Sequence, residues 1–445
     1  MKYAVFFMAL LGVPPLAVIL SFNRSLAKYV VWAMVGALAV YQSTAINFFS
    51  HEEYRGSARS MEVSVVYLLA LSLVLLAALK GRLAKFVPSA GAWLFVAYFL
   101  LCLPSLFSAE SLLYSWMELW KMMMLYLTYL AVRAYLDVTG DVKSLLKGLA
   151  AFAVWNLLLV AKDHLSGVYQ PHGVFPHQNG LAMGMHLFAN LFFAYFLAQG
   201  WRGSVLNLLA FVAASACIVR TYSRGALAMM PPSFAVTFAL MFFAGLDVPK
   251  RRVFMRILPI AAVGFIGLAA MLPRIIERFE SAPEASKNTR LELALCAKEM
   301  IDDEPWRGVG INNWGIKINP PYEYAERAGR VTNRGEEFQD GIVETVYLLV
   351  GAECGIPALV AMLVWFLYYL FVSCRLVKKL KGTPYAAIPA GLAGGFVACY
   401  LQSCLEWVLR QQMNLILLMF FFAILDHLNQ NAARIAAKAR GDGHA

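Results

Sequence analysis

Two arginines four residues apart, Arg220 and Arg224, are the first residues whose type and spacing could support chemistry. A guanidinium group keeps its charge and binds phosphate through two parallel hydrogen bonds. One helical turn would place both side chains on the same face, with Tyr222 between them in the sequence. The pair therefore predicts a site for a phosphate or pyrophosphate group, although two arginines that reach to a membrane interface would have the same spacing.

Acidic residues in or beside apolar segments are further candidates, because an ionisable side chain in such a place is a functional candidate by default. Glu344 could pair with an arginine, and Glu353 could be a contact between packed helices. Glu406 and Arg410 are four residues apart and could pair with each other. These simpler interpretations stay open beside a catalytic or binding role.

Two polar segments complete the set of candidates. His177 and Asn179 precede an apolar run, where a lone histidine is more often a hydrogen-bonded structural residue than a ligand. Arg55 and Arg59 could cap an outer loop. The sequence contains no zinc pattern, no phosphate-binding Walker loop and no DxD carboxylate pair, so it predicts chemistry without a metal, ATP or another cofactor.

The composition indicates which solvent surrounds these residues. The 445 residues are 60% hydrophobic and 15% charged, against roughly 45–50% and 25% in soluble domains. A water-soluble fold could not bury that much apolar surface, so a lipid bilayer is the expected solvent. The net charge of +11 then reflects the excess of Lys and Arg on the cytoplasmic side of membrane proteins, and it does not indicate a nucleic-acid partner.

Apolar runs long enough to cross a bilayer recur along the chain. They fall near residues 3–20, 28–46, 63–79, 92–107, 113–136, 146–161, 179–199, 205–220, 225–245, 254–272, 343–373, 386–403 and 411–427. If the runs alternate in direction, most basic residues between them, among them Arg24, Lys80 and Arg82, fall on one side, which the positive-inside rule makes cytoplasmic. The sequence therefore predicts an all-α integral membrane protein of about 12–13 transmembrane helices, multi-pass in an inner membrane.

One long polar segment, residues 273–341, falls on the opposite, extracytoplasmic side. Thr289 and Glu292 form a capping-box pattern, which predicts a helix of about three turns that starts there and ends near Asp303. Cys296 is alone in this segment, so a disulfide cannot form inside it. The predicted parts of the chain are an N-terminal transmembrane bundle at 1–272, an extracytoplasmic loop or lid at 273–341, C-terminal transmembrane helices at 342–430 and a cytoplasmic tail at 431–445.

Four stretches of the sequence resemble motifs of the O-antigen ligase/polymerase superfamily of bacterial membrane glycosyltransferases. The residues that carry the resemblance are Thr221, Ser223, Arg224 and Gly225; Asn288, Thr289, Arg290 and Leu291, followed by residues 305–314; Tyr347 and Leu348 with residues 353–359; and residues 175–179. The long outer loop and the number of apolar runs fit the same superfamily. One position departs from its pattern, because Glu344 and Thr345 stand where members usually have His-Asn.

The resemblance implies a metal-independent, inverting transfer of an undecaprenyl-pyrophosphate-linked glycan to an acceptor hydroxyl at the outer face of the membrane. It assigns Arg224, Arg220 and Arg290 to the pyrophosphate, and it assigns to Glu344 the positioning or deprotonation of the acceptor. The acceptor could be lipid A-core, another glycan unit or a protein. A transporter or flippase for lipid-linked glycans and a purely structural assembly subunit are the alternatives, and for the transporter internal repeats and interrupted spans would be expected.

Overall fold

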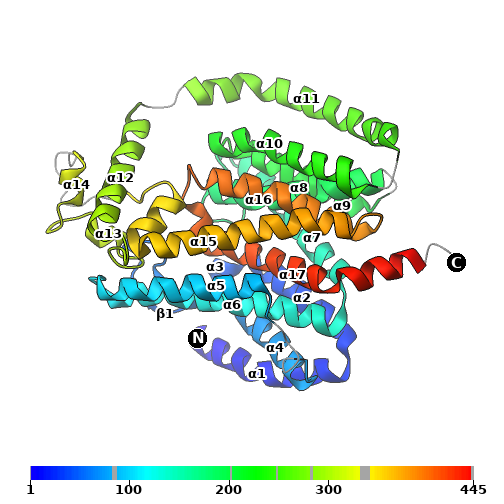
Figure 1. The fold of residues 1–445 in the computed structure, drawn as a ribbon, viewed down its shortest axis with the longest axis horizontal. Helices are drawn as coiled ribbons and strands as arrows, with labels where there is room; N and C mark the ends of the chain where they lie inside the picture. The colour runs from blue at the N-terminus through cyan, green and yellow to red at the C-terminus, as the bar shows by residue number, and fades with distance from the viewer. Residues whose placement is uncertain are drawn as a thin grey trace. The chain divides into compact units, whose positions relative to one another are not determined.

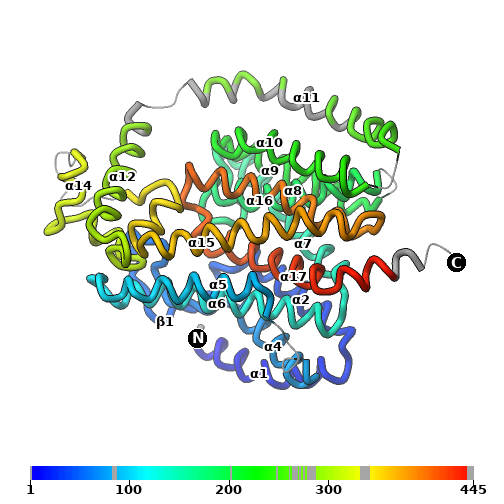
Figure 2. The backbone as a smooth tube through the Cα atoms, viewed as in Figure 1, coloured from blue at the N-terminus to red at the C-terminus, as the bar shows by residue number. Residues whose placement is uncertain are grey.

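The computed structural model describes residues 2–82, 88–200, 203–246, 249–280, 284–330 and 341–441 (Figure 2). The contacts between residues divide the chain into two compact units. Unit 1 comprises Met1–Asp141, Pro283–Tyr368 and Ser403–Ala423, and unit 2 comprises Val142–Ala282, Tyr369–Gln402 and Ile424–Ala445. Both units consist of helices, apart from one hairpin of two short strands in unit 1 (Figure 1).

Unit 1 contains the N-terminal helices and most of the long polar segment. Its elements are α1 (Lys2–Phe22), η1 (Arg24–Leu26), α2 (Ala27–Leu38), α3 (Tyr41–Thr44), β1 (Ile46–Ser50), β2 (Ser60–Val63), α4 (Val65–Leu79), α5 (Ala90–Cys102), η3 (Leu103–Phe107), α6 (Leu112–Thr139), α12 (Glu284–Asp303), α13 (Trp314–Lys317), α14 (Tyr324–Arg327), η7 (Val408–Arg410) and the first parts of α15 (Val346–Lys379) and α17 (Gln412–Gly441). Side-chain caps fix two of the starts, because Ser89 accepts from the Ala92 N–H at 3.0 Å and Ser111 accepts from the Tyr114 N–H at 3.4 Å.

Unit 2 is built around one helix that is buried on all sides. Its elements are α7 (Val142–Leu165), α8 (Gln178–Gln199), α9 (Val205–Arg220), α10 (Arg224–Leu240), η5 (Met241–Gly245), α11 (Lys250–Glu280), η6 (Pro384–Ala386), α16 (Ala387–Gln402) and the remaining parts of α15 and α17. Helix α8 contacts α7, α9, α10 and α16, and these helices lie side by side in Figure 1. The sequence favours this centre because the apolar residues of α8 surround the whole helix and do not form a single stripe.

Glycines let α16 approach α8 and α10 closely. A Cβ atom at Gly391 would lie 2.4 Å from the Leu191 Cα, and one at Gly394 would lie 2.0 Å from the Thr237 Oγ1. Small residues of this kind are the usual contact between helices in a bilayer. Asn190 adds buried hydrogen bonds, donating to the Ser233 Oγ at 3.1 Å and accepting from the Thr237 hydroxyl at 2.8 Å.

The predicted class is confirmed, since the chain is an all-α integral membrane protein with several spanning helices. Within the described residues, eight helices are long and apolar enough to cross a bilayer, and α4 and α9 are shorter apolar helices. This number is below the predicted 12–13, because α2 has 12 residues and because α6 and α11, although long, are not among the sufficiently apolar helices of the described residues. The predicted division at residues 272, 341 and 430 concerns the side of the membrane on which each segment lies. The two compact units do not test that division, and it stays a prediction.

Two local predictions are wrong. The apolar run at 28–46 is not one span, because α2 ends at Leu38 and β1 begins at Ile46. The helix expected to start at the Thr289 capping box already starts at Glu284, and it ends at Asp303 as predicted. Apolar periodicity in short stretches does not distinguish a strand from a helix, and a capping pattern can lie inside a longer helix.

Candidate functional site

Three charged residues of unit 1 meet in one group, namely Arg290, Glu344 and Glu406. The Arg290 guanidinium lies 2.5 Å from the Glu344 carboxylate and 3.6 Å from that of Glu406. The side chains of Arg290 and Glu344 are 38% and 36% exposed, whereas that of Glu406 is 9% exposed. One cation therefore stands between two carboxylates, where a substrate oxyanion could replace one of them.

A small apolar core holds this charged group in place. Residues of α12, including Leu293 and Met300, pack with Trp314 and with Val343 and Leu349 at the start of α15. The indole N–H of Trp314 also donates to the Gly341 carbonyl at 2.8 Å. The polar segment thus brings Arg290 and Glu344, which are far apart in the sequence, onto one rigid support.

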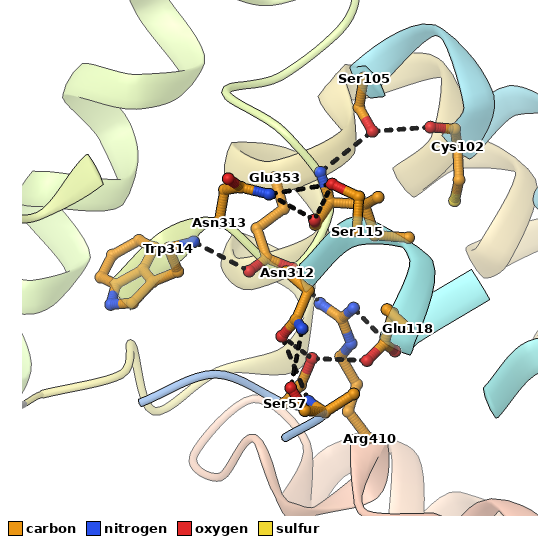
Figure 3. A network of polar contacts seen from close by, with 12 residues as sticks. Ser57, Cys102, Ser105, Ser115, Glu118, Asn312, Asn313, Trp314, Glu353 and Arg410 are labelled. Carbon is orange, nitrogen blue, oxygen red and sulfur yellow. Dashed lines mark hydrogen bonds and ion pairs between the residues drawn. The ribbon is translucent and has the colours of Figure 1, made fainter. Parts of the chain in front are cut away.

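A second group of charges in unit 1 is fully buried. Arg410 lies 2.9 Å from Glu118 and 2.6 Å from Glu353, and Lys121 lies 2.6 Å from Glu118. Lys121 also donates to the backbone carbonyls of Arg410 at 3.0 Å and Ser57 at 3.3 Å. Two cations thus balance two carboxylates, which is the condition under which ionised groups are stable in a protein interior. Figure 3 shows Arg410 beside Glu118 in this network.

This buried ion network also holds the loop that connects α12 to α13. The side chain of Asn312 donates to the carbonyls of Ala58 and Tyr114, both at 2.8 Å, and accepts from the Ala58 N–H at 3.2 Å. Asn313 donates to the Ser115 hydroxyl at 2.9 Å, and the Trp314 N–H donates to Glu353 at 3.3 Å. Figure 3 shows these side chains in one polar cluster, and the loop is therefore fixed to α6 and α15.

Glycines explain why the loop and α15 can touch backbone to backbone. The N–H groups of Val309 and Gly310 donate to the carbonyls of Ala352 and Glu353 at 2.9 and 3.1 Å. A Cβ atom at Gly308 would lie 2.4 Å from the Cys354 nitrogen. Gly355 interrupts the helix with a φ of +82°, a conformation that favours glycine. Much of the stretch that carried the family resemblance at 305–314 therefore fixes the fold.

In unit 2, Arg220 and Tyr222 lie at the turn between α9 and α10. The Arg220 guanidinium donates to the Tyr222 hydroxyl at 3.1 Å and hydrogen-bonds His164. The Tyr222 ring stacks on Tyr169 with centroids 5.5 Å apart. The single helical turn predicted for Arg220 and Arg224 is wrong, because Tyr222 has a φ of +50° and the two arginines belong to different helices.

Arg224 is the first residue of α10 and differs from Arg220 in its contacts. It forms no hydrogen bond or ion pair with the residues that the structure describes. The N-cap residue, Ser223, does not cap the helix with its side chain, and its buried hydroxyl has no hydrogen-bond partner. An uncapped helix N-terminus with a half-buried arginine attracts an anion, because its free N–H groups and the helix dipole are positive.

The N-termini of α8 and α10 lie at the same end of unit 2. Gln178, the first residue of α8, donates to Gln170 at 3.4 Å, and Gln170 donates to the Thr221 carbonyl at 3.2 Å. His177 caps α8, since its Nδ1 accepts from the Asn179 N–H at 3.2 Å. Partial burial and the neighbouring His172 lower the pKa of His177, which keeps Nδ1 able to accept at neutral pH. The predicted residues His177 and Asn179 are thus linked by a hydrogen bond, and His177 acts as the N-cap of α8.

This cap leads to a direct test of His177. His177→Asn is expected to preserve both the melting temperature and the glycan transfer that the sequence resemblance implies, because asparagine is among the best capping residues. His177→Ala should destabilise the protein by about 1 kcal/mol. Thermal unfolding in detergent measures the effect on stability, and initial rates of glycan transfer measure the effect on activity. A His177→Asn protein that is stable but transfers poorly would show that the imidazole contacts substrate.

The other predicted residues lie in unit 1. Arg55 and Arg59 are exposed in the segment between β1 and β2. Arg410 is buried, and its two carboxylate partners occupy the guanidinium, so the predicted Glu406–Arg410 pair is not formed. Glu353 is an ion-pair partner and not a simple packing contact.

Across the described ranges, His, Cys, Asp and Glu side chains do not gather in a group of three or more that could hold a metal ion.

Sequence reasoning missed Glu118 and Asn312. A signal for Glu118 was available, because Glu118 and Lys121 are three residues apart inside an apolar run and can pair on one helix face. Asn312 lies inside the 305–314 stretch that carried the family resemblance, but no local signal marks its contacts, because its partners are about 200 or more residues away in the sequence.

The comparison with known families connects these parts. Residues 209–363 match the family model described as O-antigen ligase. The matched segment includes Arg220, Arg224, Arg290, Glu344 and Glu353. No curated protein matches the chain. The match agrees with the order of the motifs in the sequence and with the membrane fold, and it supports membership of the O-antigen ligase/polymerase superfamily.

Proposed function

We propose that this protein transfers a glycan from an undecaprenyl-pyrophosphate-linked donor to an acceptor hydroxyl at the extracytoplasmic face of the bacterial inner membrane. Family membership supports a glycosyltransferase-like activity of the O-antigen ligase or polymerase type. The observation that carries the finer proposal is the start of α10, where Arg224 has no ion pair with a described residue and the helix N-terminus lacks a side-chain cap. These groups suit a pyrophosphate.

The proposed chemistry is a single displacement at the anomeric carbon. The acceptor oxygen forms the new bond to this carbon, and the bond from the carbon to the pyrophosphate oxygen breaks with inversion. Negative charge grows on the departing pyrophosphate, so Arg224 and the α10 N-terminus stabilise the transition state more than the ground state. The leaving group then needs no metal ion, and the proton of the acceptor hydroxyl goes to a carboxylate.

Glu344 is the proposed proton acceptor. It pairs with Arg290 at 2.5 Å, so its carboxylate is engaged by that guanidinium. An anionic oxygen of the substrate that pairs with Arg290 would release Glu344, whose carboxylate could then take the proton. A histidine, which is usual at this position in the superfamily, would not form an ion pair with the arginine and could act as a base directly. The replacement of histidine by Glu344 therefore makes the base depend on the binding of substrate at Arg290.

A transporter of lipid-linked glycans is the alternative, and the interruption of α15 at Gly355 is the observation that favours it. The interruption is closed, however, since a Cβ atom at Gly355 would lie 2.6 Å from the backbone of Trp306. The neighbouring charges, Glu353 and Arg410, neutralise each other. We therefore prefer transfer over transport.

Exchanging the charges of Arg290 and Glu344 tests the site in unit 1. Arg290→Glu and Glu344→Arg alone should each lower transfer about 100-fold, as expected when one charge-stabilising group is lost. The double variant restores an ion pair and should recover the melting temperature but not transfer, because the arginine then stands where the base is needed. Recovery of transfer in the double variant would show that the pair is only structural.

The assay uses purified protein in nanodiscs with a lipid-pyrophosphate-linked oligosaccharide. Lipid A-core, a second lipid-linked unit and a hydroxyl-bearing protein are offered separately as acceptors, and EDTA is present. The exposed pair Lys298 and Asp302, 2.5 Å apart on α12, supplies the matched control, because its exchange should change neither stability nor rate. Movement of the glycan across liposomes without transfer would favour the transporter.

A further inference from the structure

A polar cavity lies in unit 1 among residues that the proposed transfer does not use. It has a volume of about 360 Å³, which is within the range typical of small-ligand pockets. It is lined by Ser21, Phe22, Arg24, Lys80, Arg82 and Val138. These residues come from the end of α1, from η1, from the end of α4 and from the last turn of α6, so four segments build one concave surface.

A turn at the end of α4 sets the backbone positions of two of the three cations that line this cavity. The Arg82 N–H donates to the Ala77 carbonyl and the Gly81 N–H to the Ala78 carbonyl, both at 2.9 Å, with Gly81 at a φ of +62°. This is a Schellman motif, which sets the positions of Lys80 and Arg82 at the end of α4. The turn orders the backbone at these two positions, and the side chains of Lys80 and Arg82 are themselves exposed.

Arg24 is fixed by a turn of its own. The Asn23 side chain accepts from the Ser25 N–H at 3.1 Å and from the Ser25 hydroxyl at 2.6 Å. The Asn23 N–H in turn donates to the Ile19 carbonyl in α1 at 3.2 Å. Hydrogen bonds on both sides of Arg24 therefore hold its backbone in place, as the turn at the end of α4 does for Lys80 and Arg82.

The cavity has a positive charge that the described residues do not balance. Acidic side chains are absent from its described lining, and Arg24, Lys80 and Arg82 form no ion pair within the described ranges. Asp137, which precedes Val138, is paired with Arg133 at 3.2 Å. Three like charges in one concavity repel one another and concentrate a positive potential, so an anion bound there lowers the free energy.

Aromatic side chains indicate the depth of the cavity in the membrane. Tyr29 and Trp32, in the helix that follows Arg24, are exposed and in edge contact, with ring centroids 5.7 Å apart. Phe22 on the cavity rim is 86% exposed. Exposed Tyr and Trp gather at the membrane–water interface. The three cations therefore lie near the level of the lipid headgroups, on the side that the positive-inside rule predicts to be cytoplasmic.

We propose that this cavity binds the phosphate of an anionic glycerophosphate group, which a phospholipid headgroup of the adjacent leaflet or a soluble glycerophosphate could supply. Arg24, Lys80 and Arg82 pair with the phosphate oxygens, whereas the hydroxyl of Ser21 in the lining already donates to the Val18 carbonyl at 2.7 Å. Basic pockets between helices on the cytoplasmic side are the kind of site that recognises such headgroups. This inference is independent of the proposed glycan transfer.

Native mass spectrometry of the delipidated full-length protein tests the proposal. Dioleoylphosphatidylglycerol is titrated against dioleoylphosphatidylcholine, whose phosphate is neutralised by choline. The wild type should bind phosphatidylglycerol at least about 10-fold more tightly, and the combined Arg24→Gln, Lys80→Gln and Arg82→Gln variant should lose about 100-fold in affinity. A matched variant, with Lys378→Gln, Lys379→Gln and Lys381→Gln on the same predicted side, should bind as the wild type does.

A soluble arm separates the two sources of phosphate. If millimolar sn-glycerol 3-phosphate displaces the lipid, the cavity recognises the free group as well, and if it does not, recognition depends on the phospholipid. Equal binding of the two lipids by the wild type, or unchanged phosphatidylglycerol binding by the cavity variant, would overturn the proposal. Arg82→Gln alone, with a smaller expected loss of about 5-fold, carries the test if the combined variant does not fold.

Discussion

Replacing Arg224 with alanine should lower glycan transfer by about 100- to 1000-fold, the usual cost of one preorganised group that stabilises charge in the transition state. The melting temperature should change little, because Arg224 has no ion pair or hydrogen bond with a described residue that its removal would break. Initial rates of transfer in nanodiscs, together with thermal unfolding of the same preparations, measure the two effects.

Arg224→Lys provides the intermediate case. Lysine keeps the charge but loses the planar, two-pronged donor, so transfer should fall less than in the alanine variant. Arg251→Ala, which removes an exposed arginine from the first turn of α11, is the matched control and should transfer normally. An Arg224→Ala protein with a wild-type rate would remove Arg224 from the mechanism and with it the main support for the pyrophosphate site.

Arg410→Met is expected to have the largest effect on stability. It would leave Glu118 and Glu353 as buried carboxylates with one cation between them, and loss of one partner from a buried ion pair costs about 3–5 kcal/mol. The protein should be made at a low level, and the part that is purified should unfold at a much lower temperature. Yield and thermal unfolding in detergent are the measurements.

A double variant separates lost charge balance from lost packing. Arg410→Met combined with Glu353→Gln leaves Glu118 paired with Lys121 at 2.6 Å, so the buried charges balance again. This protein should recover a large part of the lost stability, since replacing both members of a buried pair is much less costly than removing one. A double variant as unstable as Arg410→Met would mean that the shape of the arginine, and not its charge, supports the loop.

The stability of this network also bears on the site in unit 1. Glu353 accepts from the Trp314 N–H, and Trp314 packs in the apolar core that supports Arg290 and Glu344. Loosening the network should therefore reduce activity through the position of Arg290, although Arg410 itself is buried and already paired. This distinguishes Arg410 from Arg224, whose guanidinium forms no ion pair or hydrogen bond with a described residue.

The sequence by itself determined the class of the protein and indicated the family that its residues 209–363 match. Sixty per cent hydrophobic residues in repeated runs require a bilayer and therefore helices, because backbone groups in lipid must be satisfied within each segment. The motif at 221–225 and the glycines near 308 and 355 could also be recognised in the sequence, because they mark local backbone constraints. These properties depend on composition and short-range pattern, which a single chain displays directly.

Only the tertiary structure decided which charged residues pair. Spacing favoured Glu406 with Arg410 on one helical turn, yet Arg410 pairs with Glu118 and Glu353, and Glu406 lies near Arg290. Long-range pairing depends on which buried carboxylates would otherwise remain uncompensated, and that cost is set by packing and not by spacing. The cavity of Arg24, Lys80 and Arg82 is of the same kind: the sequence placed these cations on one side of the membrane, and packing made them one cavity.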